Sequence, residues 1–264
     1  MNINEKKRAL EDYLRSLGSV AVAFSFGVDS TFLLKTAQNV LGEKAVAVTV
    51  NSDLFPGKEF EGSVGFCEKE GIEQIVIEAD ELEIEGFSAN PPDRCYICKK
   101  SIFTRIKNAA AQRGIENVAE GSNADDVSDY RPGMRAVKEL GVLSPLLESG
   151  LTKAEIRALS EEMKLPTSGK PSFACLATRI ACGEEITKEK LAMIEKAEDF
   201  LHSKGFWQVR VRVHGNLARI ETEKDDIQKL AGIADEAGGF LESLGFDFVS
   251  LDLGGYKTGS MNKI

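Results

Sequence analysis

The amino-acid sequence predicts an α/β fold, a doubly wound parallel sheet with a small C-terminal α+β domain. Continuous apolar runs such as Val20–Phe24 and Ala45–Val50 alternate with helical patterns in the first part of the chain, as expected of parallel strands buried on both faces. Beyond residue 183 the strand patterns instead alternate apolar and polar residues, which is typical of half-buried strands. We therefore expect two domains, residues 1–183 and residues 184–264.

The first domain is predicted element by element from these patterns. Residues 1–18 form an amphipathic helix, and the strands that follow are separated by helices, which indicates βαβ units. Thr152 and Glu155 have the spacing of a capping box at the start of the last helix. The expected strands are Val20–Phe24, Ala45–Val50, Gln74–Glu78 and Asn117–Glu120, with an edge strand at Leu143–Pro145. The expected helices are Thr31–Leu41, Glu59–Glu70, Lys99–Arg113 and Thr152–Met163.

The second domain is predicted to be a small α+β module. Its strands alternate in character, and a short His-Gly-Asn link between the first two is typical of a hairpin turn. The expected elements, in order, are the helix Thr187–Ser203, the strands Trp207–Val213 and Leu217–Thr222, the helix Asp225–Leu244 and the strand Phe246–Leu253.

Composition and charge narrow the class of protein. The 264 residues carry 33 basic and 42 acidic side chains, a net charge of −9, whereas nucleic-acid binding favours a basic surface. The N-terminal stretch lacks the apolar segment of a signal peptide, and no apolar run is long enough to span a bilayer. We therefore expect a cytoplasmic protein that binds neither nucleic acid nor membrane, in which cysteines stay reduced.

The turn between the first strand and the next helix reads SFGVDS, residues 25–30. It lacks the lysine of a Walker-type loop and resembles the PP-loop of ATP pyrophosphatases, usually written SGGxDS. Its hydroxyls, its glycine and the helix N-terminus behind them favour a phosphate group. The predicted ATP-binding residues here are Ala23, Ser25, Gly27, Val28, Asp29 and Ser30.

Phe26 departs from the usual motif, which has glycine at this position. Because an aromatic residue at positive φ is strained, Phe26 is expected to adopt a negative φ. The alternative interpretation of the whole stretch is an ordinary strand–helix turn in which Asp29 or Ser30 caps the helix.

Polar residues follow two further strands of the predicted sheet. The second strand ends in VNSDLFP, which begins at Val50, and EGSNADD, residues 120–126, follows the fourth strand. Ligands of open α/β sheets bind at the carboxyl ends of strands, so Val50, Gly121 and Asp125 complete the predicted ATP site. Asp29 together with Asp125 or Asp126 is expected to help hold Mg²⁺. Each segment taken alone is equally consistent with a solvated loop.

Four of the five cysteines lie in two short segments. Cys95 and Cys98 form a CxxC, whereas Cys175 and Cys182 follow much later in the chain. Three such thiols suit an iron–sulfur cluster with one open iron, and four suit structural zinc, with Cys182 as the fourth ligand. The fifth, Cys67, is expected to be a buried core thiol. Basic residues flank the four, namely Arg94, Lys99, Lys100 and Arg179; they either favour the thiolate or are solvated charges.

Two arginines alternate with valines in the strand WQVRVRV. Arg210 and Arg212 share one face because side chains alternate along a strand, and two adjacent guanidinium groups suit a phosphate between them. His214 follows at the turn. The alternative is an exposed strand face that pairs with Glu221 or Glu223 across the hairpin.

The segments SFGVDST, EGSNADD, DRCYICK, KPSFACLATR and RVRVHGNLARIE occur in one order over residues 7–260 and together resemble the LarE family of PP-loop ATP pyrophosphatases. The resemblance implies the PP-loop (adenine nucleotide α-hydrolase-like) fold and an ATP-dependent sulfurtransferase. The family adenylylates a carboxylate of pyridinium-3,5-biscarboxylic acid mononucleotide and inserts sulfur to give a thiocarboxylate, for the nickel-pincer nucleotide cofactor.

The resemblance also implies residue roles. Cys95, Cys98 and Cys175 match the branch that holds a [4Fe–4S] cluster, whose open iron carries sulfide. Cys175, Asp29 and Arg179 are the implied catalytic residues. Arg210, Arg212 and His214 are implied to hold the substrate phosphate. The implied ligands are ATP, Mg²⁺, the pyridinium mononucleotide and a sulfide or other sulfur donor. The resemblance also implies a homo-oligomer, namely a hexamer.

Several alternatives stay open at the level of sequence. In one, Cys175 gives up its own sulfur and the other cysteines bind zinc. Another is a PP-loop enzyme of tRNA thiolation, against which the acidic net charge argues. The last two are an amidating synthetase, which needs no cysteine trio, and a metal sensor with a vestigial nucleotide turn.

Overall fold

The computed structural model describes the whole chain except residues 129–131, 172–173, 258–259 and 262–264. It separates into two compact units. Unit 1 consists of Met1–Asp80 and Asp93–Phe173, and unit 2 of Glu81–Pro92 and Ala174–Ile264. The predicted division between residues 183 and 184 stays a prediction.

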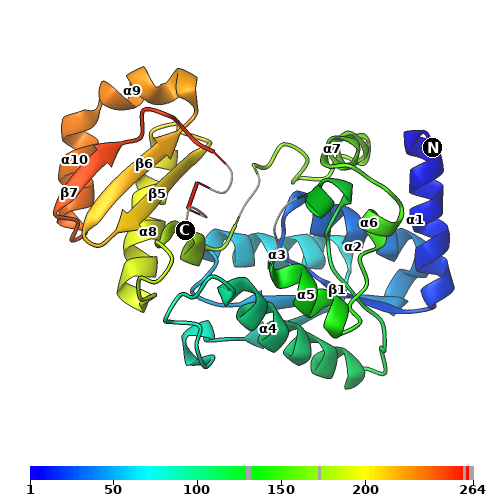
Figure 1. The fold of residues 1–264 in the computed structure, drawn as a ribbon. Coiled ribbons are helices and arrows are strands. Elements are labelled where there is room, and N and C mark those ends of the chain that lie inside the picture. Colours follow the sequence, from blue (N-terminus) through cyan, green and yellow to red (C-terminus); the bar gives the residue numbers. More distant parts are fainter. Residues whose placement is uncertain (129–131, 172–173, 258–259, 262–264) are drawn as a thin grey trace. The chain divides into compact units, whose positions relative to one another are not determined.

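Unit 1 is built around a four-stranded parallel sheet in the order β3-β2-β1-β4. Figure 1 labels β1 and the helices around it. Its strands are β1 (Val20–Ala23), β2 (Ala45–Asn51), β3 (Gln74–Glu78) and β4 (Val118–Ala119). Its longer helices are α1 (Ile3–Leu17), α2 (Val28–Leu41), α3 (Gly57–Glu70), α4 (Arg94–Ala111), α5 (Pro132–Glu139) and α7 (Lys153–Glu162), with the short helix α6 (Pro145–Glu148). This is the predicted doubly wound α/β arrangement.

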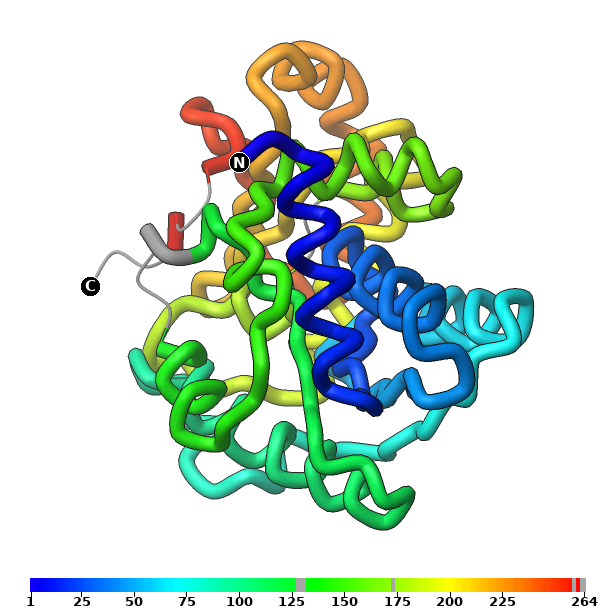
Figure 2. Tube along the Cα trace, turned by 90° about the vertical axis from the view of Figure 1, so that its right-hand side faces the viewer, coloured from blue at the N-terminus to red at the C-terminus, as the bar shows by residue number. Residues whose placement is uncertain are grey.

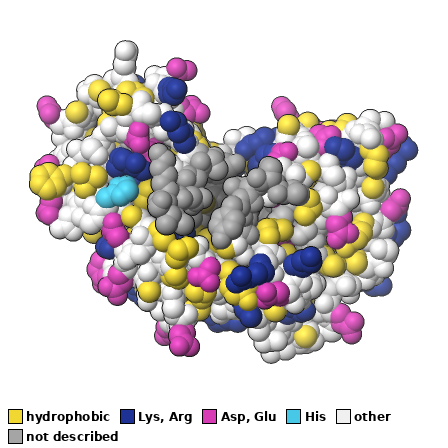
Figure 3. All heavy atoms as spheres, in the orientation of Figure 1, with side chains coloured by type: hydrophobic (Ala, Val, Ile, Leu, Met, Phe, Trp, Pro, Cys, Tyr) yellow, Lys and Arg dark blue, Asp and Glu magenta, His cyan; other side chains and the backbone are white. Residues whose placement is uncertain are grey.

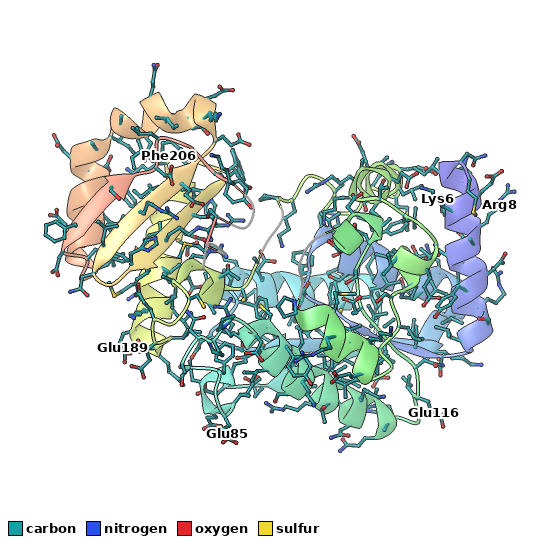
Figure 4. All side chains as sticks on the ribbon, in the orientation of Figure 1. Lys6, Arg8, Glu85, Glu116, Glu189 and Phe206 are labelled. Atoms are coloured by element: carbon teal, nitrogen blue, oxygen red, sulfur yellow. The ribbon has the colours of Figure 1, made fainter. Side chains whose placement is uncertain are left out.

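Two hydrophobic cores cover the two faces of this sheet, because its strands alternate which face each residue points to. Val20 and Val22 of β1 pack with the layer formed by α1, α2, α3 and α7. Ala21, between them, packs with Val46 and Val48 against α4 and α5. Helix α1 lies outermost over its layer (Figure 2). The ammonium of Lys6, labelled on α1 in Figure 4, donates to both carboxylate oxygens of Glu155 on α7 at 2.8 Å.

Three boundaries in unit 1 differ from the predictions. Helix α2 begins at Val28 rather than Thr31, and α4 begins at Arg94 rather than Lys99. The predicted edge strand reduces to a single parallel bridge between Ala119 and Leu143. Pro145 ends it, because proline has no N–H for a strand ladder and suits the first turn of a helix, here α6.

Unit 2 contains a three-stranded sheet in the order β5-β6-β7. Its elements are α8 (Lys188–Ser203), β5 (Val209–His214), β6 (Leu217–Thr222), α9 (Ile227–Ala231), α10 (Ala234–Ser243) and β7 (Phe248–Leu251). The first two strands form the predicted hairpin, and β7 pairs parallel to β6. Phe200 of α8 stacks on Phe240 of α10 with ring centroids 4.3 Å apart, and Phe206, labelled in Figure 4, is fully buried.

The helix predicted over Asp225–Leu244 is interrupted. After α9, Ile233 takes a non-helical conformation, and α10 starts at Ala234. Gly232, which precedes the break, is a weak helix former.

In the part of the chain that the structure describes, no helix is long and apolar enough to cross a membrane. Figure 3 shows acidic and basic side chains interspersed on the face it draws.

Candidate functional site

The N-terminus of α2 lies at the carboxyl end of β1 and carries no side-chain cap. Its N-cap is Gly27, in an extended conformation and without a capping hydrogen bond. The first intrahelical bond is donated by Thr31 N to Gly27 O at 3.0 Å. Helix geometry therefore leaves the amides of Val28, Asp29 and Ser30 without an intrahelical acceptor. The alternative in which Asp29 or Ser30 caps this helix is not what the structure shows.

Two serine hydroxyls line the same turn. The Oγ atoms of Ser25 and Ser30 are 3.2 Å apart, and the Ser25 amide donates to Ser30 Oγ at 3.3 Å. Helices α1, α7 and α8 are capped by side chains of Asn2, Thr152 and Thr187. Helices α3, α4, α9 and α10 lack such a cap, as α2 does, so the two hydroxyls at its first turn, rather than the missing cap, distinguish α2. An open helix end beside two hydroxyls suits a phosphate group.

Phe26 has a φ of +53°, so the prediction of a negative φ is wrong. Contacts to the ring outweigh the strain of about 1–2 kcal/mol expected for a left-handed non-glycine residue. The ring packs on Phe24 and Phe66 with centroids 6.1 Å away. It also occupies the space beside Gly62, where an added Cβ would lie 2.3 Å from the ring. The Lys170 ammonium lies 4.2 Å from the ring centroid and donates to Phe26 O at 3.0 Å.

The segment after β4 packs directly on the start of α2. At Gly121 an added Cβ would lie 3.1 Å from Ser30 N and 3.2 Å from Asp29 Cβ, so a larger residue would require the start of α2 or this segment to shift by a few tenths of an ångström. The buried Glu120 side chain holds the segment in place by accepting hydrogen bonds from Ser122 and Ser144. The Ser122 amide and hydroxyl donate at 3.0 and 2.8 Å and the Ser144 hydroxyl at 2.6 Å. The polar end of β4 is therefore part of the predicted nucleotide site.

Asp29 is held from two sides. Asn123 Nδ2 donates to its Oδ1 at 3.3 Å, and the ammonium of Lys153 donates to its Oδ2. The backbone amide of Lys153, the first residue of α7, also donates to Asp125 Oδ2 at 2.8 Å. Lys153 thus joins the two carboxylates that were expected to help hold Mg²⁺. Neither Lys153 nor Asn123 was predicted, because the spacing in sequence does not show which side chain reaches Asp29 across 124 residues.

The remaining predicted nucleotide residues lie at the same edge of the sheet. Ala23 ends β1 and is the register partner of Val48, two residues before Val50 near the end of β2. Among the described residues, no three His, Cys, Asp or Glu side chains form a ready-made metal site. Mg²⁺ bound with a nucleotide takes one or two carboxylates together with phosphate oxygens. The oxygen donors of Asp29 and Asp125 fit that mode of binding.

Cys95 and Cys98 lie in the first two turns of α4, not ahead of the helix as predicted. At a spacing of three they share one helix face, and both are half-buried. Arg94 Nη2 approaches Cys95 Sγ at 3.9 Å. Lys99 lies 4.0 Å from Glu120 and Lys100 3.8 Å from Glu139. Thiolate ligands of this type fit iron–sulfur or zinc chemistry.

Cys175 and Cys182 belong to unit 2. Cys175 precedes a short 3₁₀ turn, and its carbonyl accepts hydrogen bonds from the Thr178 hydroxyl at 2.8 Å and from Arg179 Nη1 at 3.2 Å. Cys182 is exposed, and its Sγ lies 3.5 Å from Asn90 O. Burial raises the pKa of the Cys67 thiol in unit 1 to about 12, which agrees with its prediction as a core residue.

Arg179 is fully buried, with 0% of its surface exposed. Its Nε and Nη2 each donate to a carboxylate oxygen of Glu198 on α8 at 2.9 Å, and Nη1 donates to Ala174 O at 2.6 Å. Glu198 also accepts from the Val211 amide at 3.0 Å. Arg179 therefore ties the Cys175 segment to α8 and β5.

Arg210 and Arg212 are buried as well, so neither face of β5 is exposed. Arg212 donates to Glu221 Oε2 through Nε and Nη2 at 3.0 and 2.9 Å. Glu221 is one of the two cross-strand partners that the alternative interpretation named, but the pair is buried rather than exposed. The Arg210 guanidinium lies 5.4 Å from the centroid of the Tyr256 ring. Burial and the neighbouring Arg179 charge lower the pKa of Arg210.

His214 ends β5 beside a two-residue turn. Its Nε2 is buried without a hydrogen-bond partner among the described residues. Burial, followed by the charge of Arg219, lowers the pKa of His214 and favours the neutral ring. The neighbouring Gly215 amide donates to both carboxylate oxygens of Glu184, at 3.0 and 2.9 Å.

The structure thus gathers the predicted nucleotide residues in unit 1. In unit 2, Arg210, Arg212 and His214 lie on one strand, and Arg179 shares Glu198 with that strand. Glu198 and Glu221, the carboxylate partners of Arg179 and Arg212, differ in how far the sequence predicts them. Glu221 follows from cross-strand spacing, whereas Glu198 lies on a polar-looking helix and carries no such signal.

No family model matches the chain. The chain is 38% identical over 258 residues to the pyridinium-3,5-bisthiocarboxylic acid mononucleotide synthase of Lactiplantibacillus plantarum, covering 97% of this chain and 94% of that protein. It is 38% identical over 266 residues to an uncharacterized protein of Synechocystis, with 99% and 98% covered. A weaker similarity, 26% over 220 residues, links it to a subunit of the glutamine-hydrolyzing GMP synthase of Thermoplasma volcanium, with 77% and 70% covered.

Identity of this level over nearly the full length of both chains matches the order of motifs found in the sequence and the parallel sheet with its uncapped α2. The chain therefore belongs to the LarE family of PP-loop ATP-utilizing enzymes, the family of the Lactiplantibacillus plantarum synthase.

Proposed function

We propose that this enzyme uses ATP to adenylylate a carboxylate of pyridinium-3,5-biscarboxylic acid mononucleotide and then inserts sulfur to give a thiocarboxylate. The name of the relative at 38% identity supports this substrate class. The observation that carries the ATP half of the proposal is the uncapped N-terminus of α2, flanked by Ser25 and Ser30.

In the first half-reaction, the amides of Val28, Asp29 and Ser30 hold the triphosphate. A substrate carboxylate oxygen attacks the α-phosphorus, the bond to the β-phosphate bridging oxygen breaks, and pyrophosphate leaves. The helix end and the hydroxyls stabilise the charge that develops on the leaving group. Mg²⁺, when bound through Asp29 and Asp125, supplies further neutralisation of the phosphates.

In the second half-reaction, a sulfur nucleophile attacks the acyl carbon and AMP leaves. The proposed ligand set for a [4Fe–4S] cluster is Cys95, Cys98 and Cys175; such a cluster, when bound, would supply an open iron that keeps sulfide deprotonated. The half-buried pair on the first two turns of α4 supports soft-metal binding.

The roles proposed in unit 2 take burial into account. For Arg179, predicted from the resemblance as catalytic, we propose a positioning role, because its guanidinium donates to the carbonyls of Ala174 and Cys175 and is itself held by Glu198. Arg210, Arg212 and His214 are proposed to bind the substrate phosphate. Arg212 already has a carboxylate partner in Glu221. The substrate phosphate would therefore bind a guanidinium group that this ion pair already holds in place.

Exchange of labelled pyrophosphate into ATP tests the first half-reaction. We expect exchange that depends on the pyridinium mononucleotide and on Mg²⁺, and that persists in Cys175→Ala while thiocarboxylate formation stops. Exchange that is independent of the pyridinium substrate, or absent with it, would contradict the proposal.

Metal analysis tests the second half-reaction. Protein purified without oxygen is expected to contain iron and acid-labile sulfide, and Cys95→Ala and Cys98→Ala should lose both. Zinc in their place, together with loss of the Cys175 sulfur by mass spectrometry after turnover, would show instead that the protein consumes its own cysteine.

A further inference from the structure

Lys153 occupies an unusual place for a surface lysine. Its backbone amide is fixed on Asp125 Oδ2 at 2.8 Å at the start of α7, and the capping box of Thr152 and Glu155 holds that helix end. Its side chain crosses to Asp29, the acidic residue in the first turn of α2. One residue thus links the first turn of the nucleotide helix, the end of β4 and the start of α7.

The ion pair between Lys153 and Asp29 is accessible to a ligand. The two side chains retain 27% and 21% of their exposed surface, and the lysine stem is flexible while its backbone is fixed. Of the Asp29 oxygens, Oδ1 accepts from Asn123 and Oδ2 from Lys153. The Asp29 carboxylate is therefore neutralised by the chain itself in the ligand-free enzyme.

This pairing does not suit the nucleotide-bound enzyme. A divalent cation and an ammonium group on one carboxylate repel each other strongly at close range. A triphosphate brings several negative oxygens to the same helix end, and these accept an ammonium group well. The lowest-energy arrangement then places the metal on the carboxylate and the ammonium on the phosphates.

We propose that Lys153 exchanges partners when Mg·ATP binds: its ammonium leaves Asp29 for the phosphates, and Asp29 becomes free to ligate magnesium. This inference rests on the proposed ATP site in unit 1 and adds to it a residue that neither the motif nor the family name assigns. Before binding, the ion pair prevents the Asp29 charge from repelling the nucleotide. After pyrophosphate has left, return of Lys153 to Asp29 resets the site.

Equilibrium titration of the full-length protein with ATP, with and without Mg²⁺, tests the exchange. Lys153→Met is expected to weaken Mg·ATP binding by roughly 10- to 100-fold, because a charge-assisted hydrogen bond to the phosphates is lost. The same substitution should weaken the binding of metal-free ATP by a larger factor than the binding of Mg·ATP. Lys153→Arg should restore part of the affinity. Because the pair is partly exposed, we expect Lys153→Met to lower the melting temperature by no more than about 2–4 °C.

Asp29→Asn supplies the reciprocal test. With Asp29 uncharged, Lys153 is available to the phosphates from the start, so metal-free ATP should bind more tightly than to the wild type, while Mg²⁺ should no longer improve binding. The matched control is Lys35→Met, which removes an ion pair with Glu70 of similar exposure, 22% and 23%, from the middle of α2; its ATP affinity should equal that of the wild type.

The outcomes separate the two claims. Wild-type binding of Mg·ATP with no change in Lys153→Met, or equal effects of Lys153→Met and Lys35→Met, would overturn the exchange and leave the ATP site standing. Weaker metal-free binding in Asp29→Asn would also overturn it. No binding of Mg·ATP by the wild type would overturn the proposed function and the exchange with it.

Discussion

The charged residues of unit 1 and unit 2 are held in different ways. At the start of α2, Asp29 and Lys153 are partly exposed, to 21% and 27% of their side-chain surface, and form an ion pair with each other. Around β5, the guanidinium groups of Arg179 and Arg212 are buried and each donates twice to one carboxylate. The first arrangement is the one proposed to change partners when Mg·ATP binds, whereas the second is buried within unit 2.

The difference shows how burial assigns roles to similar residues. An ion pair that is open to solvent contributes little to folding, about 0–1 kcal/mol, so we expect the partly exposed pair of Lys153 and Asp29 to matter more for the proposed ligand binding than for stability. Removing one partner of a buried pair carries a large cost, so the fold holds the arginines of unit 2 in place, and the substrate binding proposed for Arg210 and Arg212 is a role in addition to that. The predictions below test this contrast.

The largest effect is expected from Glu198→Gln. The substitution keeps the shape of the side chain but leaves the buried Arg179 charge without its partner, which should lower the free energy of unfolding by about 3–5 kcal/mol. Urea denaturation measures the change. In the matched control Glu70→Gln, whose partner Lys35 is half-exposed, the loss should stay below about 1 kcal/mol. Equal losses in the two variants would remove the contrast between buried and exposed pairs.

A smaller effect is expected from Gly121→Ala. The new Cβ would lie 3.1 Å from Ser30 N and 3.2 Å from Asp29 Cβ, so the segment after β4 must move away from the start of α2. We expect a loss of about 1–3 kcal/mol in stability and weaker binding of Mg·ATP by titration calorimetry. Gly65→Ala is the control: Gly65 is a helical position in α3 with no heavy atom within 4 Å of an added Cβ, and it should stabilise the protein by about 0.5–1 kcal/mol. Unchanged ATP affinity in Gly121→Ala would mean that this contact does not shape the site.

Phe26 offers a comparison of strain with packing. Phe26→Gly and Phe26→Ala both remove the ring contacts with Phe24 and Phe66, but only glycine also removes the strain of φ at +53°. The glycine variant should therefore be more stable than the alanine variant by about 1 kcal/mol in thermal or urea unfolding. An alanine variant at least as stable as the glycine variant would show that the left-handed conformation is not maintained.

The smallest effect concerns Cys67, which is buried in unit 1 and has no role in the proposed reaction. Burial raises its pKa to about 12, so the folded protein favours the neutral thiol. Its contribution to stability is complete below the pKa of an unfolded thiol, about 8.5, and is lost as the pH rises from there through 12. At pH 8 we expect iodoacetamide to modify the exposed Cys182 and to leave Cys67 unmodified, as read by peptide mass spectrometry. Rapid alkylation of Cys67 in the folded protein would contradict this.

The fold of unit 1 could be predicted from the sequence because its signals are local. Strands buried on both faces are apolar throughout, as in Val20–Ala23, and glycines such as Gly42 end helices. The errors arise where tertiary contacts decide. Phe26 adopts a conformation that its residue type disfavours, since its ring fills the space beside Gly62, and α10 separates from α9 at Ile233 within a stretch of continuous helical periodicity.

The site could be predicted only in part for the same reason. The turn at residues 25–30 and the polar ends of the strands are contiguous motifs, so they are visible in the sequence. Lys153 is not, since its partner Asp29 lies 124 residues away. Glu198 was also missed, because nothing in the pattern of α8 distinguishes a carboxylate that accepts from Arg179 from one that faces solvent.

The central claim is that the start of α2 binds the triphosphate of ATP. A crystal structure of the full-length protein with Mg²⁺ and a non-hydrolysable ATP analogue tests it most directly. The account predicts phosphate oxygens within hydrogen-bond distance of the amides of Val28, Asp29 and Ser30. Phosphates bound away from this turn, with the three amides facing solvent, would contradict it.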